Sequence, residues 1–407
     1  MHVELDPRFR ETHEGRRAAE LISACVHCGF CLETCPTYLD RRDERDSPRG
    51  RIYLVKQLLE TGTAGAATRT HLDRCLTCRS CETTCPSGMR YGELLDIGRG
   101  LMEIEAPRGV ADRLGRLLLR AVFSRPALLT PLIALGRLVR PLLPGALRSK
   151  IPPRQVRGPL PAEAHTRHMV LLEGCVQSVA TPRTNGAARR VLDKLGITLR
   201  APGEAGCCGA LAFHLGAQDE GLDCARRNID AWWPLIEKGA ERGAEAVVSS
   251  ASGCGAMIAD YGRLLADDPD YADRARQISQ LHRDLAEVVG GQDLSGLPAA
   301  TLKSRVAVHC PCTQQHALGL APAVPDILRR AGLTLADTRD GHLCCGSAGT
   351  HALLEPGAAG RMRRRALDNL CADAPELIAT ANVGCQLHLQ GDSDTPVVHW
   401  IELLDRD

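Results

Sequence analysis

The stretch CVHCGFCLETCP, residues 25–36, is matched further along the chain by CLTCRSCETTCP, residues 75–86. Each stretch spaces its cysteines as C-x2-C-x2-C-x3-C-P, a run typical of [4Fe–4S] clusters. Three thiolates separated by two residues fit three corners of one cubic cluster. The fourth comes a helical turn later, is followed by proline, and points towards a different cluster. Two such runs predict two [4Fe–4S] clusters and a role in electron transfer.

The paired runs resemble those of bacterial-type ferredoxins, in which the fourth cysteine of each run ligates the cluster of the other run. The resemblance implies two ligand sets: Cys25, Cys28, Cys31 and Cys85 for the first cluster, and Cys35, Cys75, Cys78 and Cys81 for the second. Between the runs, DERDSPRGRIYLVKQLLETG predicts a helix capped by Ser47, with Pro48 at its first position and Gly62 at its end. A helical insert favours an all-α ferredoxin-like domain over residues 1–104.

The composition limits the compartment and the partners. Lys and Arg total 50 and Asp and Glu total 49, so a net charge of +1 in 407 residues does not favour nucleic acid. The 19 cysteines follow a polar start without an apolar leader, which favours reduced, metal-bound thiols in the cytoplasm over a disulfide framework. An uninterrupted apolar run of about 20 residues is missing, so we expect no membrane-spanning helix.

Residues 105–162 form a basic, leucine- and proline-rich linker, which we expect to be cut into short helices by Pro126, Pro131, Pro141 and Pro144. Within it, residues 113–157 carry ten basic residues and no acid. Peripheral contact with the cytoplasmic face of an anionic inner membrane, near a quinone, is one interpretation. Packing of the leucines on a neighbouring domain or a partner subunit is the other, and it is favoured.

The remainder of the chain is a duplication that predicts two α/β domains, residues 163–300 and 301–407. Each copy opens with an apolar run and a cysteine, followed 32 positions later by a Cys-Cys-Gly triplet, and closes with an apolar run and a lone cysteine. The helix-then-strand patterns VLDKLGITLRAP and ILRRAGLTLADT precede the two triplets. We expect the cysteines to follow the carboxyl ends of parallel strands.

Four thiols in each copy are candidate metal ligands: Cys175, Cys207, Cys208 and Cys254 in the first, and Cys312, Cys344, Cys345 and Cys385 in the second. Adjacent cysteines suit the different irons of one cluster better than a tetrahedral zinc. The 32-residue spacing selects Cys312 over Cys310. Cys224 and Cys371 have no counterpart in the repeat and are interpreted as buried small hydrophobic residues.

The Cys-Cys-Gly repeat resembles the cysteine-rich domain of heterodisulfide reductase subunits and of the iron–sulfur subunits of anaerobic glycerol-3-phosphate dehydrogenase and glycolate oxidase. The complete family motif closes with C-x2-C, but Ala251 and Asn382 replace the first cysteine of that pair here. Each site then has four candidate ligands rather than five. No, one or two further clusters in this half are all compatible with the sequence.

The segments CGFCLETCPTY, DSPRGRIYL and HLDRCLTCRSCETTCPSGMRYGELLDIGR are most similar to the glycolate oxidase iron–sulfur subunit. The resemblance implies an electron-transfer subunit of an oxidoreductase, whose flavin-bearing partners oxidise glycolate to glyoxylate and whose acceptor is a membrane quinone. The equivalent subunit for glycerol 3-phosphate or D-lactate, a heterodisulfide-reductase-like thiol–disulfide enzyme and a zinc scaffold are the alternatives. No dinucleotide-binding or nucleophile motif occurs, so we expect no flavin, NAD or substrate site in this chain.

Several polar residues near the cysteines have an ordinary interpretation that we favour over a redox role. We interpret His27 as a solvated loop residue. The four histidines near the second repeat's cysteines could bind iron, hydrogen-bond to sulfur or relay protons, but are read as surface or capping residues: His309, His316, His351 and His388. Arg49 and Arg51 could balance cluster charge, but a solvated helix face is favoured.

Overall fold

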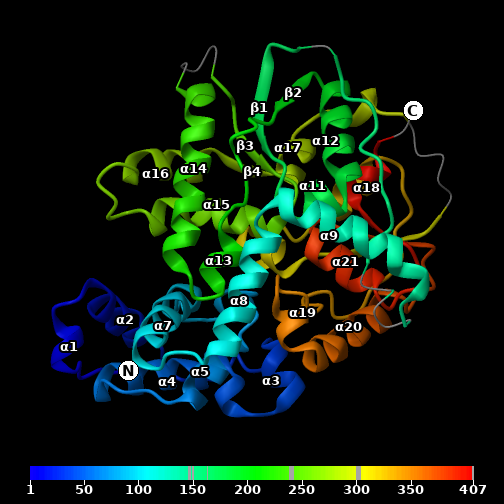
Figure 1. Cartoon of the computed structure of the whole chain (residues 1–407). Helices are drawn as coiled ribbons and strands as arrows, with labels where there is room; N and C mark the ends of the chain where they lie inside the picture. Colours follow the sequence, from blue (N-terminus) through cyan, green and yellow to red (C-terminus); the bar gives the residue numbers. More distant parts are fainter. Residues whose placement is uncertain (145–147, 149–150, 163, 238–242, 299–303, 406–407) are drawn as a thin grey trace. The chain divides into compact units, whose positions relative to one another are not determined.

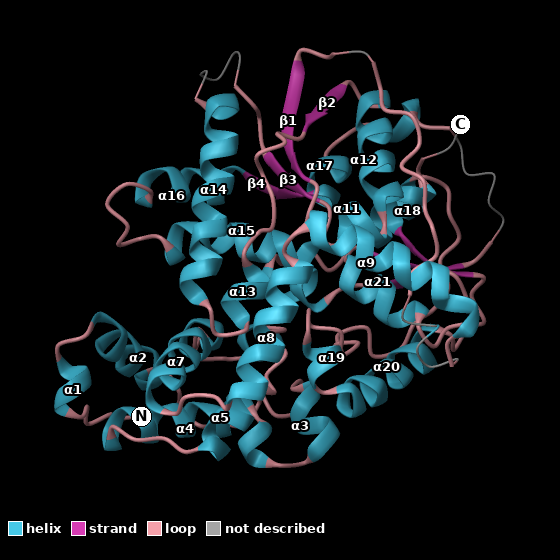
Figure 2. Ribbon diagram, viewed as in Figure 1, coloured by secondary structure: helices cyan, strands magenta, loops and turns pink. Residues whose placement is uncertain are grey.

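The computed structural model describes residues 1–144, 148, 151–162, 164–237, 243–298 and 304–405. The chain divides into two compact units. The first comprises Met1–Leu117 and His342–Arg365, and the second comprises Leu118–Gly341 and Ala366–Asp407. Strands β1–β7 all belong to the second unit (Figure 2).

The first unit is built from helices around one apolar core. Residues 1–117 are all described and contain no strand. Ile22, Leu58 and Leu94 are among the core residues with 1% exposure or less, and they come from α2, α4 and α7. The helices within this unit are α1 (Pro7–Arg10), α2 (His13–Ser23), α3 (Pro36–Arg41), α4 (Pro48–Thr61), α5 (Ala66–Asp73), α6 (Ser80–Thr83), α7 (Tyr91–Glu105) and α19 (His351–Leu354), with the short 3₁₀ helix η1 (Glu44–Asp46).

Helix α4 confirms the helix predicted between the two cysteine runs. The Ser47 hydroxyl accepts a hydrogen bond from the Gly50 N–H at 2.9 Å, which satisfies one of the free donors of the first turn. Pro48 takes the first helical position. Gly62 ends the helix with φ +66°, a conformation in which glycine is not strained.

The segment His342–Arg365 packs with the N-terminal residues although it lies far from them in sequence. Glu355 pairs with Arg41 at 3.0 Å and with Arg74 at 3.5 Å. Arg361 forms a two-point pair with Asp40, with both N···O distances 2.7 Å. The first unit therefore includes residues from both ends of the chain.

Two helices follow the first unit's core, α8 (Val110–Phe123) and α9 (Pro126–Val139), before the 3₁₀ helix η2 (Arg140–Leu142). Pro126 begins α9 as expected, but Pro131 lies inside that helix and does not end it. The Thr130 hydroxyl donates to the Pro126 carbonyl at 2.8 Å. Pro144 adjoins residues outside the described part.

Among the described residues, no single helix is long and apolar enough to cross a membrane. One pair of helices, Val110–Phe123 with Pro126–Leu142, reaches that length and composition together and is bent by 95°.

The first sheet is parallel, with strand order β2-β1-β3-β4. Met169 and Leu171 of β1 pack with α12 and α17, whereas Val170 and Leu172 pack with α14, α15 and α16 (Figure 1). A strand covered on both faces explains the continuous apolar run in the sequence. The elements are β1 (Arg167–Leu172), β2 (Ile197–Arg200), β3 (Val247–Ser249) and β4 (His282–Asp284), with α11 (Gln177–Ala180), α12 (Pro182–Lys194), α13 (Ala210–His214), α14 (Gln218–Ile236), α15 (Ser252–Leu264), α16 (Ala272–Leu281) and α17 (Leu285–Gly290).

The second sheet is also parallel, with order β5-β6-β7. Val306 and Ala379 of this sheet belong to the same apolar cluster as Leu171 and Val248 of the first. The elements are β5 (Val306–His309), β6 (Leu377–Thr380) and β7 (Val397–His399), with η3 (Leu294–Gly296), the π-helical turn η4 (Thr313–Ala317), α18 (Ala323–Arg330), α20 (Pro356–Leu370), α21 (Val383–Gln390) and η5 (Trp400–Leu403).

One expected strand is missing from the second repeat. ILRRAGLTLADT predicts a helix and then a strand, but after α18 only Leu335 forms a bridge, with Val306. Val306 donates to Thr334 O and accepts from the Ala336 N–H, both at 2.9 Å. A single residue of β5 makes both bonds, so no ladder extends from them.

Candidate metal centres

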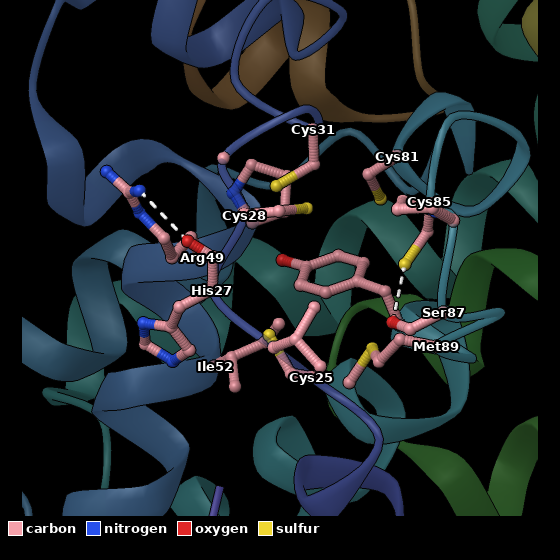
Figure 3. Close-up of a pocket in the computed structure, with 15 residues that line it drawn as sticks. Cys25, His27, Cys28, Cys31, Arg49, Ile52, Cys81, Cys85, Ser87 and Met89 are labelled. Carbon is pink, nitrogen blue, oxygen red and sulfur yellow. Dashed lines mark hydrogen bonds between the residues drawn. The ribbon is translucent and has the colours of Figure 1, made fainter.

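The four thiols predicted for the first cluster line one pocket: Cys25, Cys28, Cys31 and Cys85 (Figure 3). Cys25 follows the end of α2, and Cys85 follows α6 at the end of the second run. The pocket thus brings thiols of the second run to three thiols of the first. Cys81 also lines it, beside the apolar side chains of Ile52 and Met89.

The electrostatics of this pocket differ between its thiols. Burial raises the pKa of the Cys31 thiol to about 11, so without a metal this group is a neutral thiol. The pKa of Cys85 is lowered although burial opposes the shift, because the Ser87 hydroxyl, 3.3 Å from the sulfur, and backbone N–H groups including that of Met89 stabilise the thiolate. These hydrogen bonds favour the thiolate form of Cys85, which is the form that binds a metal cation.

The second predicted set also comes together. Cys81 is buried, which raises the pKa of its thiol well above the usual value, and the neighbouring thiols of Cys78, Cys75 and Cys35 raise it further. The Tyr91 hydroxyl lies 3.7 Å from the Cys75 sulfur. Soft thiolate donors in two groups of four fit iron–sulfur clusters, which supply one-electron transfer when bound.

The two cysteine loops share an unusual backbone. The residue before and the residue after the second cysteine of each run are left-handed: His27 (φ 56°) and Gly29 (φ 85°) in the first run, and Thr77 (φ 51°) and Arg79 (φ 58°) in the second. Three of these four are not glycine, and such strain is concentrated at functional loops. His27 therefore contributes to the turn of its loop through its backbone.

The expectation that Arg51 lies on a solvated face is wrong. Its side chain is 1% exposed, because Arg51, Val55 and Leu58 share the buried face of α4 at helical spacing. Its Nε donates to His71 O at 2.6 Å and its Nη1 to Thr37 Oγ1 at 3.1 Å. Its Nη2 has no hydrogen-bond partner among the described residues. Arg49 is partly exposed and donates to Glu44 at 2.7 Å.

The four candidate thiols of the first repeat follow strand ends, as predicted. Cys175 comes after β1, the Cys207–Cys208 pair after β2, and Cys254 in the first turn of α15 after β3. The sulfurs of Cys175 and Cys207 lie 3.5 Å apart. The thiols of Cys208 and Cys254 are also neighbours. A hydrogen bond with Cys207 lowers the pKa of Cys208, but the hydrogen bond with Cys254 and burial together raise it well above its usual value. Four sulfurs therefore meet in one domain.

The glycine of each Cys-Cys-Gly triplet has a defined role. Gly209 (φ +93°) and Gly346 (φ +87°) are left-handed, and each donates its N–H to the sulfur of the first cysteine of its pair, at 3.5 Å and 3.4 Å. A Cβ on Gly209 would lie 2.3 Å from Gly221 O. Glycine is required there by conformation and by space.

The candidate thiols of the second repeat are divided between the two units. Cys344 and Cys345 belong to the first unit and are buried, whereas Cys312 and Cys385 belong to the second. Cys312 directly precedes η4, and Cys385 lies in the first turn of α21.

Two histidines near these cysteines are buried rather than surface residues, which corrects the expectation. His309 lies at the end of β5, and its Nδ1 is 2.9 Å from Thr380 Oγ1. Burial lowers the pKa of His309 to about 4, so it is neutral at ordinary pH. His351 is also buried, with Nδ1 3.4 Å from Gly346 O.

Cys224 is a further member of the first repeat's thiol group, which the sequence did not predict. It is buried, as expected, but it belongs to the same small buried cluster as Cys175 and Cys207. An internal repeat cannot reveal a residue that only one copy has. The available signal was helical spacing, since Cys224 and Asn228 share one face of α14, and Asn228 binds Cys207 O at 2.9 Å.

A helical unit with two runs of four cysteines, followed by duplicated cysteine-rich α/β folds, defines an iron–sulfur protein of the electron-transfer class. Family models match in the same places: the 4Fe-4S dicluster domain over residues 21–89, and the cysteine-rich domain over 169–259 and 306–390. The glycolate oxidase iron-sulfur subunit of Escherichia coli is 49% identical over 407 residues, covering 100% of this chain and 99% of that protein. The chain belongs to the family of glycolate oxidase iron–sulfur subunits.

More distant relatives share less of the sequence. A probable glycolate oxidase iron-sulfur subunit of Bacillus subtilis is 28% identical, covering 93% of this chain and 90% of that protein. Lactate utilization protein A of Exiguobacterium is 26% identical over 58% of this chain and 97% of its own length. A crystal structure of a hypothetical protein from Helicobacter pylori has a TM-score of 0.54 at 11% identity, covering 97% of this chain and 73% of that one. This last likeness concerns the fold alone.

Proposed function

We propose that this chain is the electron-transfer subunit of a glycolate-oxidising complex. Flavin-bearing partner subunits oxidise glycolate to glyoxylate, and the chain carries the electrons to a membrane quinone. The observation that carries the proposal is the gathering of both cysteine runs, eight thiols that we assign to two groups of four, in one helical unit of a chain that matches its E. coli relative from end to end.

The proposal assigns one cluster to each group. Cys25, Cys28, Cys31 and Cys85 hold the first, and Cys35, Cys75, Cys78 and Cys81 hold the second, in an all-α ferredoxin-like domain over residues 1–104. The linker is 105–162, and the cysteine-rich domains are 163–300 and 301–407. Thiols of those two domains bind further iron–sulfur clusters.

The substrate is tested by reconstituting the chain with its partner subunits and following reduction of a soluble quinone analogue. We expect glycolate to reduce the clusters and the quinone. A complex that turns over D-lactate or glycerol 3-phosphate but not glycolate would assign the chain to one of the related dehydrogenases. Turnover of a disulfide by the purified chain alone would support the thiol–disulfide alternative.

The surface of α9 supports contact with a membrane as the place of quinone reduction. Leu128, Leu132 and Leu135 are 46%, 50% and 56% exposed and lie on one side of this helix. Residues 113–157 add ten basic side chains and no acid. Exposed leucines with flanking cations suit an anionic lipid surface. These features support our proposal that the chain is a cytoplasmic protein peripherally attached to the inner face of the membrane.

A further inference from the structure

The first cysteine-rich domain contains a fifth thiol that its repeat partner lacks. Cys224, in α14, packs with Cys175 and Cys207 in a small buried cluster. Its thiol is hydrogen-bonded to that of Cys207. Sixteen positions after the Cys-Cys pair the first repeat has Cys224, whereas the second has Arg361.

The packing of α14 explains how Cys224 reaches the other thiols. Gly209 and Gly221 let two backbone segments approach closely, and a Cβ on Gly209 would lie 3.3 Å from the Cys224 Cβ. One turn further along α14, the Asn228 amide donates to Cys207 O at 2.9 Å, and its oxygen accepts from the Gly206 N–H at 2.9 Å. The same helix face thus holds the Cys-Cys-Gly turn and presents the fifth sulfur to it.

Tyr261 of α15 fixes the second cysteine of the Cys207–Cys208 pair. Tyr261 is buried, and its hydroxyl donates to Cys208 O at 2.8 Å. Asn228 also reaches that hydroxyl, at 3.2 Å, so one network fixes the carbonyls of both paired cysteines. Ala251, at the start of α15, contributes no thiol.

The charge around Cys224 suits an anionic metal site. The Arg227 guanidinium lies beside the Cys224 thiol, and its Nη2 donates to Cys207 O at 3.4 Å. A cation near several thiolates offsets their negative charge. Five thiols also exceed the four positions of a tetrahedral zinc, so they indicate a site with more than one metal atom.

We propose that Cys224 is a fifth thiolate ligand of an iron–sulfur cluster in the first cysteine-rich domain, together with Cys175, Cys207, Cys208 and Cys254. This inference rests on the proposed presence of a cluster in that domain. It makes the two repeats unequal, because the second repeat has no thiol at the matching position.

The test is iron and acid-labile sulfide analysis of the anaerobically purified full chain, with low-temperature EPR and Mössbauer spectra. The variants are Cys224→Ala, Cys254→Ala and, as control, Cys371→Ala, which removes a cysteine of the second repeat that has no counterpart in the first. Wild type should hold more than the roughly eight irons of two four-iron clusters. Cys224→Ala should lose the iron of the first cysteine-rich domain, as Cys254→Ala does, whereas Cys371→Ala should hold as much iron as wild type.

The EPR signals of the two N-terminal clusters report whether each variant is folded, and Cys224→Ser should change the spectrum of the additional cluster through an oxygen ligand. If Cys224→Ala and Cys224→Ser keep the iron content and spectra of wild type while Cys254→Ala loses iron, the domain binds a cluster but Cys224 is not one of its ligands. About eight irons in wild type, or zinc without sulfide, would overturn the cluster of this domain and the inference with it.

Discussion

Arg51 donates its Nε proton to the backbone oxygen of His71 at 2.6 Å, which ties α4 to the last turn of α5 just before the second cysteine run. The same guanidinium interacts electrostatically with Cys75 and Cys35, one thiol from each run. Arg51 therefore positions a loop that carries cluster ligands and places a buried positive charge beside them.

Replacing Arg51 by glutamine should make the second cluster harder to reduce. Loss of a buried cation removes stabilisation of the reduced, more negative cluster. We expect its potential to fall by on the order of 60 mV, a tenfold change in the one-electron equilibrium. EPR-monitored redox titration measures this, with the first cluster as internal reference. Arg45→Gln removes an exposed arginine paired with Asp43 at 2.7 Å and should leave both potentials unchanged.

Serine substitutions test the exchange of the last ligand between the two runs. Cys85→Ser should damage the cluster held by the first run, because Cys85 lines the pocket of Cys25, Cys28 and Cys31. Cys35→Ser should damage the cluster held by the second run. Low-temperature EPR of the reduced proteins distinguishes the two signals. Loss of each variant's own-run cluster would contradict the assignment.

Gly209→Ala should destabilise the first cysteine-rich domain by about 3 kcal/mol or more, because the new Cβ would meet a backbone oxygen in addition to the left-handed strain. Gly196→Ala is the matched control, since Gly196 has φ +74° but no atom within 4 Å of its Cβ position. That change should cost only about 1 kcal/mol. Anaerobic denaturant unfolding compares the two, and equal losses would show that the contact with Gly221 does not matter.

His282 should make the second unit less stable in acid. Burial lowers its pKa to about 4, and its Nε2 lies 2.9 Å from Ser249 Oγ. The unfolded chain binds a proton near pH 6.5 that the folded chain refuses until about pH 4, so stability falls as the pH drops through this window. The loss approaches about 3 kcal/mol at its lower end. Wild type should therefore weaken more than His282→Gln between pH 6.5 and 4.5 in anaerobic unfolding, and parallel curves would refute this.

Leu132→Asp with Leu135→Asp should weaken binding to vesicles of phosphatidylglycerol and phosphatidylethanolamine at least tenfold, since burying one leucine contributes about 1.5–3 kcal/mol. Co-sedimentation measures the bound fraction. Thr130→Asp adds a charge on the opposite side of α9 without removing an apolar side chain, and should change binding much less. Equal binding by the double variant and wild type would rule out this surface as the membrane contact.

Features that depend on neighbouring residues in the sequence could be predicted with exact residue bounds, whereas features that depend on tertiary packing could not. Both ends of α4 follow from the chemistry of Ser47, Pro48 and Gly62, which acts within one turn. The burial of Arg51 depends on the helices packed around α4. From the sequence alone, a charged residue next to the apolar face of a helix is expected to lie at the solvent-exposed edge of that face. Cys224 joins its group through tertiary packing that no repeat encodes.

Residues 342–365 complete the unit that begins at Met1, and the ribosome makes them long after the cysteine runs. At roughly 5–20 residues per second, synthesis of the intervening Leu118–Gly341 takes on the order of ten to forty seconds. During that time Asp40 and Arg41 lack their partners Arg361 and Glu355. During this interval the N-terminal helices are not yet covered by residues 342–365. Their cysteine thiols are then more accessible to the proteins that deliver iron–sulfur clusters.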